Sequence, residues 1–359
     1  MTNKAWFQWG VGILIALLIV KFFLEVNWLF HPLLVILKAV AVPLLLGGVL
    51  FYVTLPIQQF LEKRGIPRWG SITIIFILLT VLLTAFVLIV GDPISEQLNN
   101  LVQAAPSIAT EIQRAVDYVL MNKADFPPQL EDAIDSMANS IQDYAITLST
   151  WLVGAITSLV SATLSIVIVP FFFIFMLKDH EKLAPFIYQF FTGERRDWLK
   201  RTLEDINDTI RNYVQGQILV SFILAIFILI GYTIIGLEYT LILVILSFFM
   251  NMIPFLGPWL SFIPAVIVAL IQEPSLVIWV AAINLVAQQL ESNIVTPNVM
   301  GKSLELHPLT VITVILAAGN LGGFVAIILA VPVYAVIKAI VRNVYEERKA
   351  IKKTVSKEV

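Results

Sequence analysis

Residues 71–90 read SITIIFILLTVLLTAFVLIV, a run without a single charged side chain. As an α-helix, about 20 apolar residues are long enough to cross the roughly 30 Å hydrocarbon core of a bilayer. Two more uncharged runs, 151–177 and 214–237, satisfy the same length criterion. All three are continuously apolar instead of alternating every second residue, which excludes an outer-membrane β-barrel. They predict membrane-spanning helices.

The composition supports the same class of protein. Hydrophobic residues make up 59% of the 359 positions and charged residues 13%, and the mean hydropathy is +0.90. One soluble core could not bury this much apolar surface. The absence of cysteine excludes disulfides, thiolate metal sites and cysteine nucleophiles. We therefore expect an all-α polytopic membrane protein with roughly eight hydrophobic segments.

Charge placement predicts the orientation of the spans. The loop 58–69 contains Lys63, Arg64 and Arg68, and the positive-inside rule places it, and hence the N-terminus, in the cytoplasm. The segment 92–150 is acidic, and its two apolar helical stripes flank Phe126-Pro127-Pro128, which predicts an external amphipathic helical hairpin. The basic segment 178–212 and the basic C-terminal tail should be cytoplasmic.

The last third of the chain does not divide into simple spans. Segments 241–271 and 309–340 are each too long for one crossing and too short for two. Each is interrupted near its middle, at Asn251–Pro258 and at Gly319–Gly323. We expect two re-entrant helical hairpins whose tips meet in a solvated or substrate-lined cavity, because irregular backbone at membrane depth needs protein or water around it. Each hairpin, paired with a preceding span, gives two units of opposite orientation, as in many secondary transporters.

These features divide the chain into six parts. They are the first three spans in 1–91, the external amphipathic segment in 92–150, the fourth span in 151–177, the cytoplasmic amphipathic segment in 178–212, a core with two re-entrant hairpins in 213–340, and the basic cytoplasmic tail in 341–359.

A polar stretch marks the candidate site. Residues 288–297, QQLESNIVTP, directly follow the uncharged run 275–287, and polar groups at membrane depth commonly mark a solute or ion path. With the two hairpin tips, the candidate substrate pathway comprises Asn251, Pro254, Gly257, Pro258, Gln288, Gln289, Glu291, Asn293, Pro297, Gly319, Asn320, Gly322 and Gly323. Arg211 and Gln217 are expected at the cytoplasmic mouth of the fifth span.

Each candidate also has a structural interpretation. Glu291 is a candidate proton or cation site, because desolvation makes a carboxylate easier to protonate; alternatively it caps a helix end or pairs with Lys302. The amides of the polar stretch either bind a polyhydroxylated solute or join two helices. The proline-rich tip either offers free carbonyls to a ligand or only kinks the chain. The glycine-rich tip is equally suited to close helix packing, and Arg211 to snorkelling toward the membrane surface.

The sequence contains no enzyme signature. It has no phosphate-binding Gly-Lys-Ser/Thr loop and no His-Glu-x-x-His motif. We expect neither an enzyme nor a protein that needs a cofactor, a metal or a nucleic acid, so any transport should be passive or coupled to an ion gradient. The expected partners are the lipid bilayer and a small polar solute or a monovalent cation.

Three motifs resemble one family. They are IRNYVQGQ at 210–217, PFLGPWLSFIP at 254–264 and PNVMGKSLELHP at 297–308. Together they resemble the autoinducer-2 exporter family, also called PerM-like permeases. The resemblance implies a multi-pass protein of the bacterial inner membrane. It also implies links to export of the quorum-sensing signal autoinducer-2 in some members and to sodium-proton or lithium-proton antiport in others.

Three functions therefore remain open. The leading hypothesis is a secondary transporter or facilitator that exports a small polar solute such as autoinducer-2. The second is a monovalent cation-proton antiporter that uses Glu291. The third is an oligomeric membrane scaffold without transport. The apolar stripe Leu199, Leu203, Ile206 and Ile210 and the external hairpin favour a homo-oligomer; the resemblance suggests a ring, with a pentamer as the candidate number.

Overall fold

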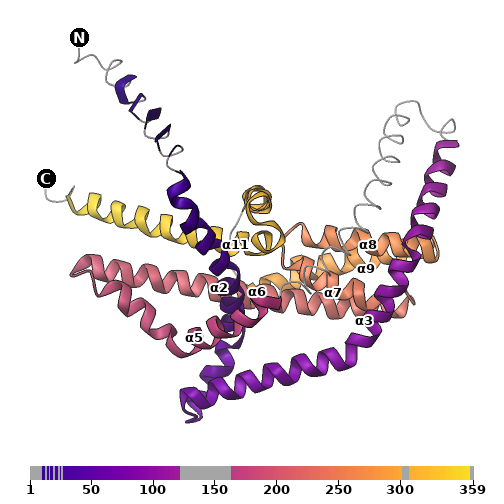
Figure 1. Ribbon diagram of the computed structural model, residues 1–359, viewed down its shortest axis with the longest axis horizontal. Helices are drawn as coiled ribbons and strands as arrows, with labels where there is room; N and C mark the ends of the chain where they lie inside the picture. Colours follow the sequence, from indigo (N-terminus) through magenta and orange to yellow (C-terminus); the bar gives the residue numbers. More distant parts are fainter. Residues whose placement is uncertain are drawn as a thin grey trace.

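The computed structural model describes residues 10–12, 14–15, 17–18, 21–22, 25, 27–121, 163–300 and 307–355, and in these residues it is helical without strands. The elements are α2 (Asn27–Lys63), α3 (Arg68–Met121), α5 (Thr163–Tyr188), α6 (Glu194–Ile234), α7 (Thr240–Asn251), α8 (Gly257–Gln272), α9 (Leu276–Leu290), the π-helix η2 (Glu291–Val295), α10 (Thr296–Met300) and α11 (Pro308–Val355). Figure 1 shows α6, α7, α8 and α9 bundled together, with α3 and the α5–α6 arm extending away from them.

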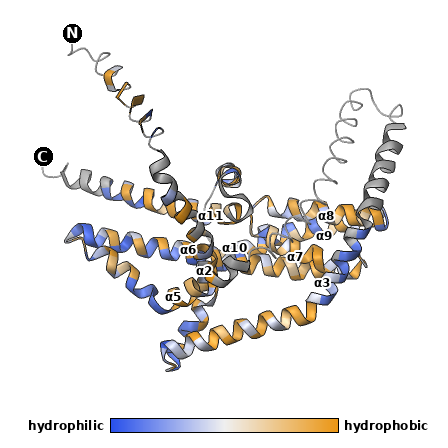
Figure 2. Ribbon diagram, viewed as in Figure 1, coloured by the Kyte–Doolittle hydropathy of each residue, from blue (hydrophilic) through white to orange (hydrophobic). Residues whose placement is uncertain are grey.

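Four described helical segments are long and apolar enough to cross a membrane: Pro43–Lys63, Arg68–Gln97, Glu194–Ile234 and Ala326–Glu347. In α3 the apolar residues face outward, with Leu88 exposed at 74% and Ile89 at 72%. Figure 2 shows the hydrophobic colouring of the ribbon along the first half of α3. In water such a surface would be strongly unfavourable, whereas lipid tails solvate it. The all-helical membrane class is confirmed; the number of eight segments stays a prediction, and 151–162 lies outside the described residues.

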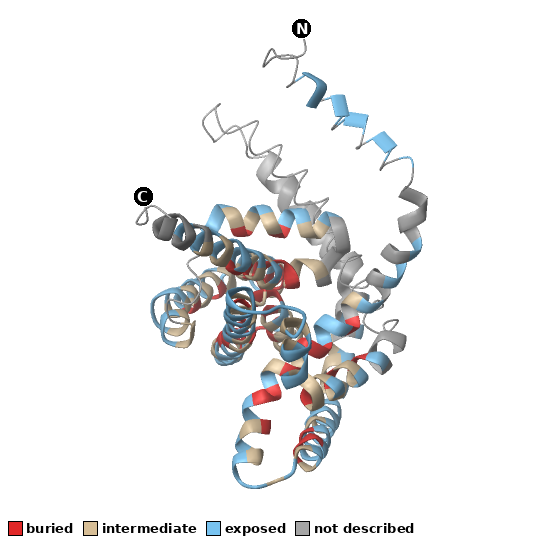
Figure 3. Ribbon diagram, turned by 90° about the vertical axis from the view of Figure 1, so that its left-hand side faces the viewer, coloured by how far each residue is buried: buried red, intermediate tan, exposed pale blue. Residues whose placement is uncertain are grey.

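Helix α2 packs closely on α5. Phe51 and Leu55 of α2 are buried in one cluster with Phe173 and Leu177 of α5. Gly47 permits this approach, because a Cβ atom there would lie 2.9 Å from Phe172 Cβ and 3.1 Å from the Phe173 nitrogen. Figure 3 shows the buried residues concentrated where such helix pairs meet, while the outer faces are exposed.

Arg68, at the start of α3, ties the α2–α3 turn to α5. Its guanidinium donates to Glu181 at 2.8 Å and to the Leu177 carbonyl at 3.2 Å. The hydrogen bond from Arg68 holds the pKa of the Glu181 carboxyl below its usual value. The two predicted cytoplasmic segments, 58–69 and 178–212, therefore contact each other.

Helices α7 and α8 form a helical hairpin with its break where the sequence predicted it. α7 ends at Asn251 and α8 begins at Gly257, and Phe255 between them adopts a φ of 65°. The open end is closed by Gln272, which accepts from the Glu238 nitrogen and donates to the Gly236 carbonyl, both at 2.8 Å. At 12 residues, α7 is about 18 Å long, too short to cross a bilayer alone.

This geometry yields a topology prediction. Single cysteines at Glu238 and Glu273, which flank the open end of the hairpin, should both react with a membrane-impermeant maleimide from outside. Single cysteines at Lys302 and Arg342 should react only from inside. The chain has no native cysteine to interfere. Labelling of Glu238 and Glu273 from opposite sides would show that α7 and α8 cross the membrane instead of re-entering.

The second expected break is absent. Backbone helix continues through Gly319–Gly323 within α11. The helix nevertheless bends there: a Cβ on Gly319 would lie 3.2 Å from Ile327 Cδ1, although eight residues of straight helix advance about 12 Å. Val311, Ile315, Ala330 and Val331 accordingly share one buried cluster. The predicted interruption therefore takes the form of a sharp bend within α11, and the second re-entrant hairpin stays a prediction.

Helices continue across two of the predicted boundaries, which themselves stay predictions. Helix α3 continues to Met121, as expected for a helical segment after residue 91. The remainder of the external hairpin, including Phe126-Pro127-Pro128, lies outside the described residues. Both α5 and α6 extend into 178–212, and α6 leads from it into the expected fifth span. Hydropathy marks where a helix leaves lipid but not where the helix itself ends.

Candidate functional site

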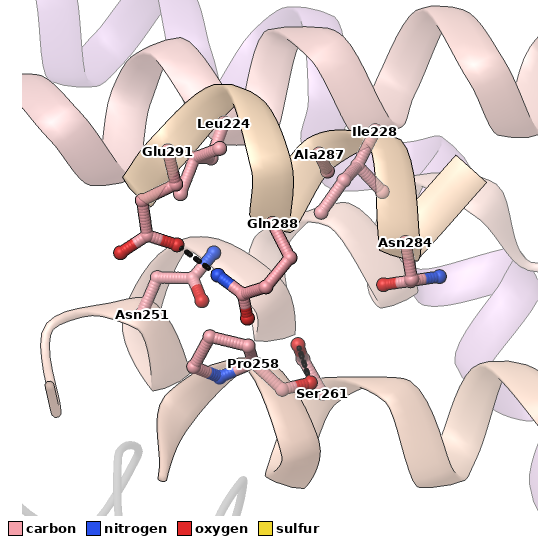
Figure 4. Close-up of a pocket in the computed structure, with 9 residues that line it drawn as sticks. All are labelled: Leu224, Ile228, Asn251, Pro258, Ser261, Asn284, Ala287, Gln288 and Glu291. Atoms are coloured by element: carbon pink, nitrogen blue, oxygen red, sulfur yellow. Dashed lines mark hydrogen bonds between the residues drawn. The ribbon is translucent and has the colours of Figure 1, made fainter. Parts of the chain in front are cut away.

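A small pocket lies where the α7–α8 hairpin meets α6 and α9. Its lining residues come from every element of that bundle: Leu224 and Ile228 of α6, Asn251 of α7, Pro258 and Ser261 of α8, Asn284, Ala287 and Gln288 of α9, and Glu291 of η2. Figure 4 shows Asn251, Gln288 and Glu291 close together at one end of the pocket and Asn284 toward the other end. The interior has room for about one water molecule.

The tip of the hairpin forms the floor of the pocket. A series of hydrogen bonds between buried polar side chains holds this tip in place. Asn251 donates to Ser247 Oγ at 3.3 Å, and Ser247 lies 3.5 Å from Ser261 Oγ. Ser261 in turn donates to the Pro258 carbonyl at 3.1 Å. The Pro254 carbonyl accepts from the Leu256 nitrogen at 2.8 Å. Each of these two proline carbonyls thus accepts a local hydrogen bond, and its second lone pair is available to a ligand.

The opposite wall is the polar face of α9 and η2. Asn284, Gln288 and Glu291 follow at spacings of four and three residues, which places them on one helical face. Gln288 Nε2 donates to the Glu291 carboxylate at 2.6 Å. Asn284 Nδ2 donates to Tyr232 Oη of α6 at 2.7 Å and to the Val280 carbonyl at 2.8 Å.

Glu291 begins a π-helical turn. The Thr296 nitrogen donates to the Glu291 carbonyl, an i to i−5 bond, and the next residue, Pro297, has no N–H to continue an α-helical ladder. Such π-turns widen a helix locally and occur frequently at functional sites. Pro297 does not itself line the pocket, but it favours the π-helical turn that positions Glu291 in the pocket wall.

Gln217 reaches the site, whereas Arg211 does not. Gln217, only 7% exposed, donates to the Asn251 carbonyl at 2.6 Å and fastens the hairpin tip to α6. Arg211 lies one and a half turns earlier on α6, where it donates to Gln59 of α2 at 3.4 Å. The sequence grouped the two residues at one mouth, but they face different neighbours.

The structure brings together only some of the predicted residues. Asn251, Pro258, Gln288 and Glu291 line the pocket. Gln289 is exposed and accepts from Asn293 at 2.8 Å on the same helix, away from the lining. Two α11 candidates lie elsewhere: Asn320 is exposed and donates back to the Leu316 carbonyl at 3.0 Å, and neither it nor Gly319 lines the pocket. The surroundings of Gly322 and Gly323 lie outside what the structure describes. The α7–α8 loop and the α11 bend share an apolar cluster through Ile253, Leu256, Ala318 and Ile327.

Sequence reasoning missed two polar lining residues, Ser261 and Asn284. It also missed the apolar lining residues Leu224, Ile228 and Ala287. Asn284 was detectable, because it precedes Gln288 by four residues and Glu291 by seven on the same helical face. Ser261 had no such signal, since serine is common in membrane helices and its partner Ser247 is distant in sequence.

Comparison with known proteins shows which family the chain belongs to. The chain matches the family described as AI-2E family transporters over residues 11–346. It is 33% identical to YueF of Bacillus subtilis (strain 168), over 94% of this chain and 92% of YueF, and 30% identical to YrrI of the same strain, over 92% and 94%. It is 27% identical to PerM of Escherichia coli (strain K12), over 83% and 86%. YueF and YrrI are named provisionally as transport proteins and PerM as a permease. The resemblance seen in three sequence motifs is confirmed, and the chain is a multi-pass membrane protein that belongs to the AI-2E transporter family.

Proposed function

We propose that the protein is a secondary transporter or facilitator of the bacterial inner membrane that exports a small polar solute, with an autoinducer-2-like signal as the first candidate. The observation that carries this proposal is the lining of the pocket. Amides of Asn251, Asn284 and Gln288 and the hydroxyl of Ser261 converge inside a bundle whose helices are otherwise apolar. These groups suit hydrogen bonding to an uncharged, hydroxyl-rich molecule.

The same pocket indicates how such a solute would pass. Room for about one water molecule is too little for a sugar-like solute, so the walls must separate during transport. The α7–α8 hairpin is the element suited to move, because both its ends join short turns. Its tip meets α6 through the Gln217 bond to the Asn251 carbonyl and through the apolar cluster that Met250 and Ile253 share with Tyr213 and Val214. In this proposal both termini are cytoplasmic, and the working unit is a homo-oligomer.

Cation-proton antiport is the second candidate, and it rests on Glu291. Among the described residues it is the one carboxylate that lines the pocket, and an acid among apolar helices is the kind of group that proton-coupled antiport uses. An exchanged cation is small enough to need less widening of the pocket than a sugar-like solute does.

Glu291→Gln should separate the two candidates, because it keeps size and hydrogen bonding but removes the titrating carboxyl. In proteoliposomes, downhill autoinducer-2 flux should stay within about twofold of wild type, while sodium-driven proton flux, if the protein catalyses it, should fall to the level of empty vesicles. Glu238→Gln, an exposed acid in the α6–α7 turn, serves as the control and should change neither flux. Loss of autoinducer-2 flux in a normally folded Glu291→Gln protein would refute uncoupled facilitation and show that solute export needs the carboxyl group. Wild-type protein that moves neither species would refute both candidates.

A further inference from the structure

A lysine of α5 is held against two aromatic rings where α5 passes the start of α3. Lys178 Nζ lies 5.1 Å from the centroid of the Trp69 ring and 5.8 Å from that of the Phe175 ring. Both distances are in the range of cation–π contacts. Trp69 is 59% exposed and Phe175 is 57% exposed. These three residues, which we call the Lys178 cluster, therefore lie on the outer surface of the helices.

The charge of Lys178 has no carboxylate partner within the described part of the chain. No described aspartate or glutamate forms an ion pair with its ammonium. The neighbouring Asp179 pairs with Lys182 at 2.5 Å. Glu181 instead accepts from Arg68 at 2.8 Å. The aromatic rings attract the ammonium but carry no net charge, so Lys178 can pair with an anion from outside the chain.

Apolar side chains continue from the Lys178 cluster along both helices. On α3, Phe76 follows Trp69 by seven residues, and on α5, Phe171 precedes Lys178 by seven residues. Seven residues are about two turns, so each phenylalanine lies on the same helical face as its partner and about 10 Å further into the uncharged run of its helix.

Both phenylalanines are exposed. Figure 2 shows the hydrophilic colouring of the α2–α3 turn giving way to hydrophobic colouring along α3. A ligand that fits both helices thus has a negative headgroup with long apolar chains below it.

We propose that the Lys178 cluster binds an anionic phospholipid of the bilayer, with the lipid phosphate paired to the Lys178 ammonium and the acyl chains against the exposed faces of α3 and α5. Trp69 and Lys178 both lie in segments predicted to be cytoplasmic, and the cytoplasmic leaflet carries the anionic lipids that basic groups between membrane helices recognise. Trp69 suits this position because tryptophan favours the headgroup level. None of the three residues lines the transport pocket, so the site does not depend on which species is carried.

Native mass spectrometry of the purified full-length protein in detergent tests this proposal, with phosphatidylglycerol and phosphatidylcholine of the same chain length added in separate titrations. Wild type should bind phosphatidylglycerol saturably and about fivefold more tightly than phosphatidylcholine, which is the preference expected from one lysine near the headgroups. Soluble glycerol 1-phosphate, added at the same concentration as the lipid, should not displace it, because it lacks the acyl chains.

A second lysine provides the matched control. Lys178→Gln should weaken phosphatidylglycerol binding about fivefold and leave phosphatidylcholine binding unchanged, because it removes the charge and keeps most of the side chain. Lys178→Arg, which keeps the charge and the cation–π contact, should bind within about twofold of wild type. Lys200→Gln removes the same charge from an exposed lysine of α6 that pairs with Glu204, and should also stay within about twofold. All variants should elute as the same species as wild type.

Equal affinities of wild type for the two lipids would overturn the site, because Lys178 would then only extend toward any headgroup. Equal losses in Lys178→Gln and Lys200→Gln would overturn it too, since the preference would follow the total charge of the protein. Displacement by glycerol 1-phosphate would show a site for a free anion instead of a lipid. Lipid binding is measured without transport, so failure of either transport candidate would not remove this site.

Discussion

Gly257→Ala should abolish transport, although it adds a single methyl group. A Cβ at this position would lie 2.0 Å from the carbonyl oxygen of Met250 and 2.6 Å from its carbonyl carbon. Both are backbone atoms of α7, which cannot turn aside as a flexible side chain can, so the two helices of the hairpin must separate. Overpacking of this kind costs about 1–3 kcal/mol or more. Because Asn251 and Pro258 line the pocket on either side of Gly257, its walls must shift with them.

The measurement is the flux of autoinducer-2 and of sodium-driven protons in proteoliposomes, alongside thermal unfolding in detergent. The flux should fall for whichever species the wild type carries, and the midpoint of unfolding should fall too. Gly91→Ala in α3 is the control, since its Cβ would make an ordinary 3.7 Å contact with Val87 Cγ1. Normal flux and normal unfolding of Gly257→Ala would mean that the α7–α8 approach is looser than described here and that the transport path lies elsewhere.

The second large effect is expected at Gly47, where α2 meets α5. Gly47→Ala should lower the free energy of unfolding by about 1–3 kcal/mol, because its Cβ would press on Phe172 Cβ and on the backbone nitrogen of Phe173. Phe173 and Leu177 of α5 are buried against α2, so the strain would spread through that cluster. Transport should decline only as far as the folded population does, since none of the described residues of α2 and α5 lines the pocket.

The adjacent glycine makes a matched comparison for this change. A Cβ on Gly48 would lie 3.5 Å from Met176 Cε, an ordinary contact with the flexible end of a side chain. Gly48→Ala should therefore unfold at or slightly above the wild-type temperature, because alanine is the better helix former. The experiment compares urea or thermal unfolding of the two variants in the same detergent. Identical stabilities would contradict the α2–α5 packing.

The sequence alone determined those properties that depend on neighbouring residues. The uncharged run 71–90 predicted a span that the structure contains in α3, and the proline-rich interruption at Asn251–Pro258 correctly predicted the break between α7 and α8. Three motifs identified the family, which the comparison confirmed. Hydropathy, helix-breaking residues and motif spacing are all local quantities, so they can be evaluated without knowing how helices pack.

The tertiary structure decided which polar groups meet. From sequence, Gln288 and Gln289 were equivalent candidates, yet only Gln288 faces the pocket, because helix rotation is set by the apolar packing of α9 on α6 and α8. Gln217 was assigned to the cytoplasmic mouth of the fifth span, and the sequence could not show its bond to Asn251, because 34 residues separate the two. The glycines of 319–323 were expected to break α11 and instead accompany a bend within it. Periodicity fixes what can lie on one face of a helix, whereas the partner of that face depends on how all the helices fill space together.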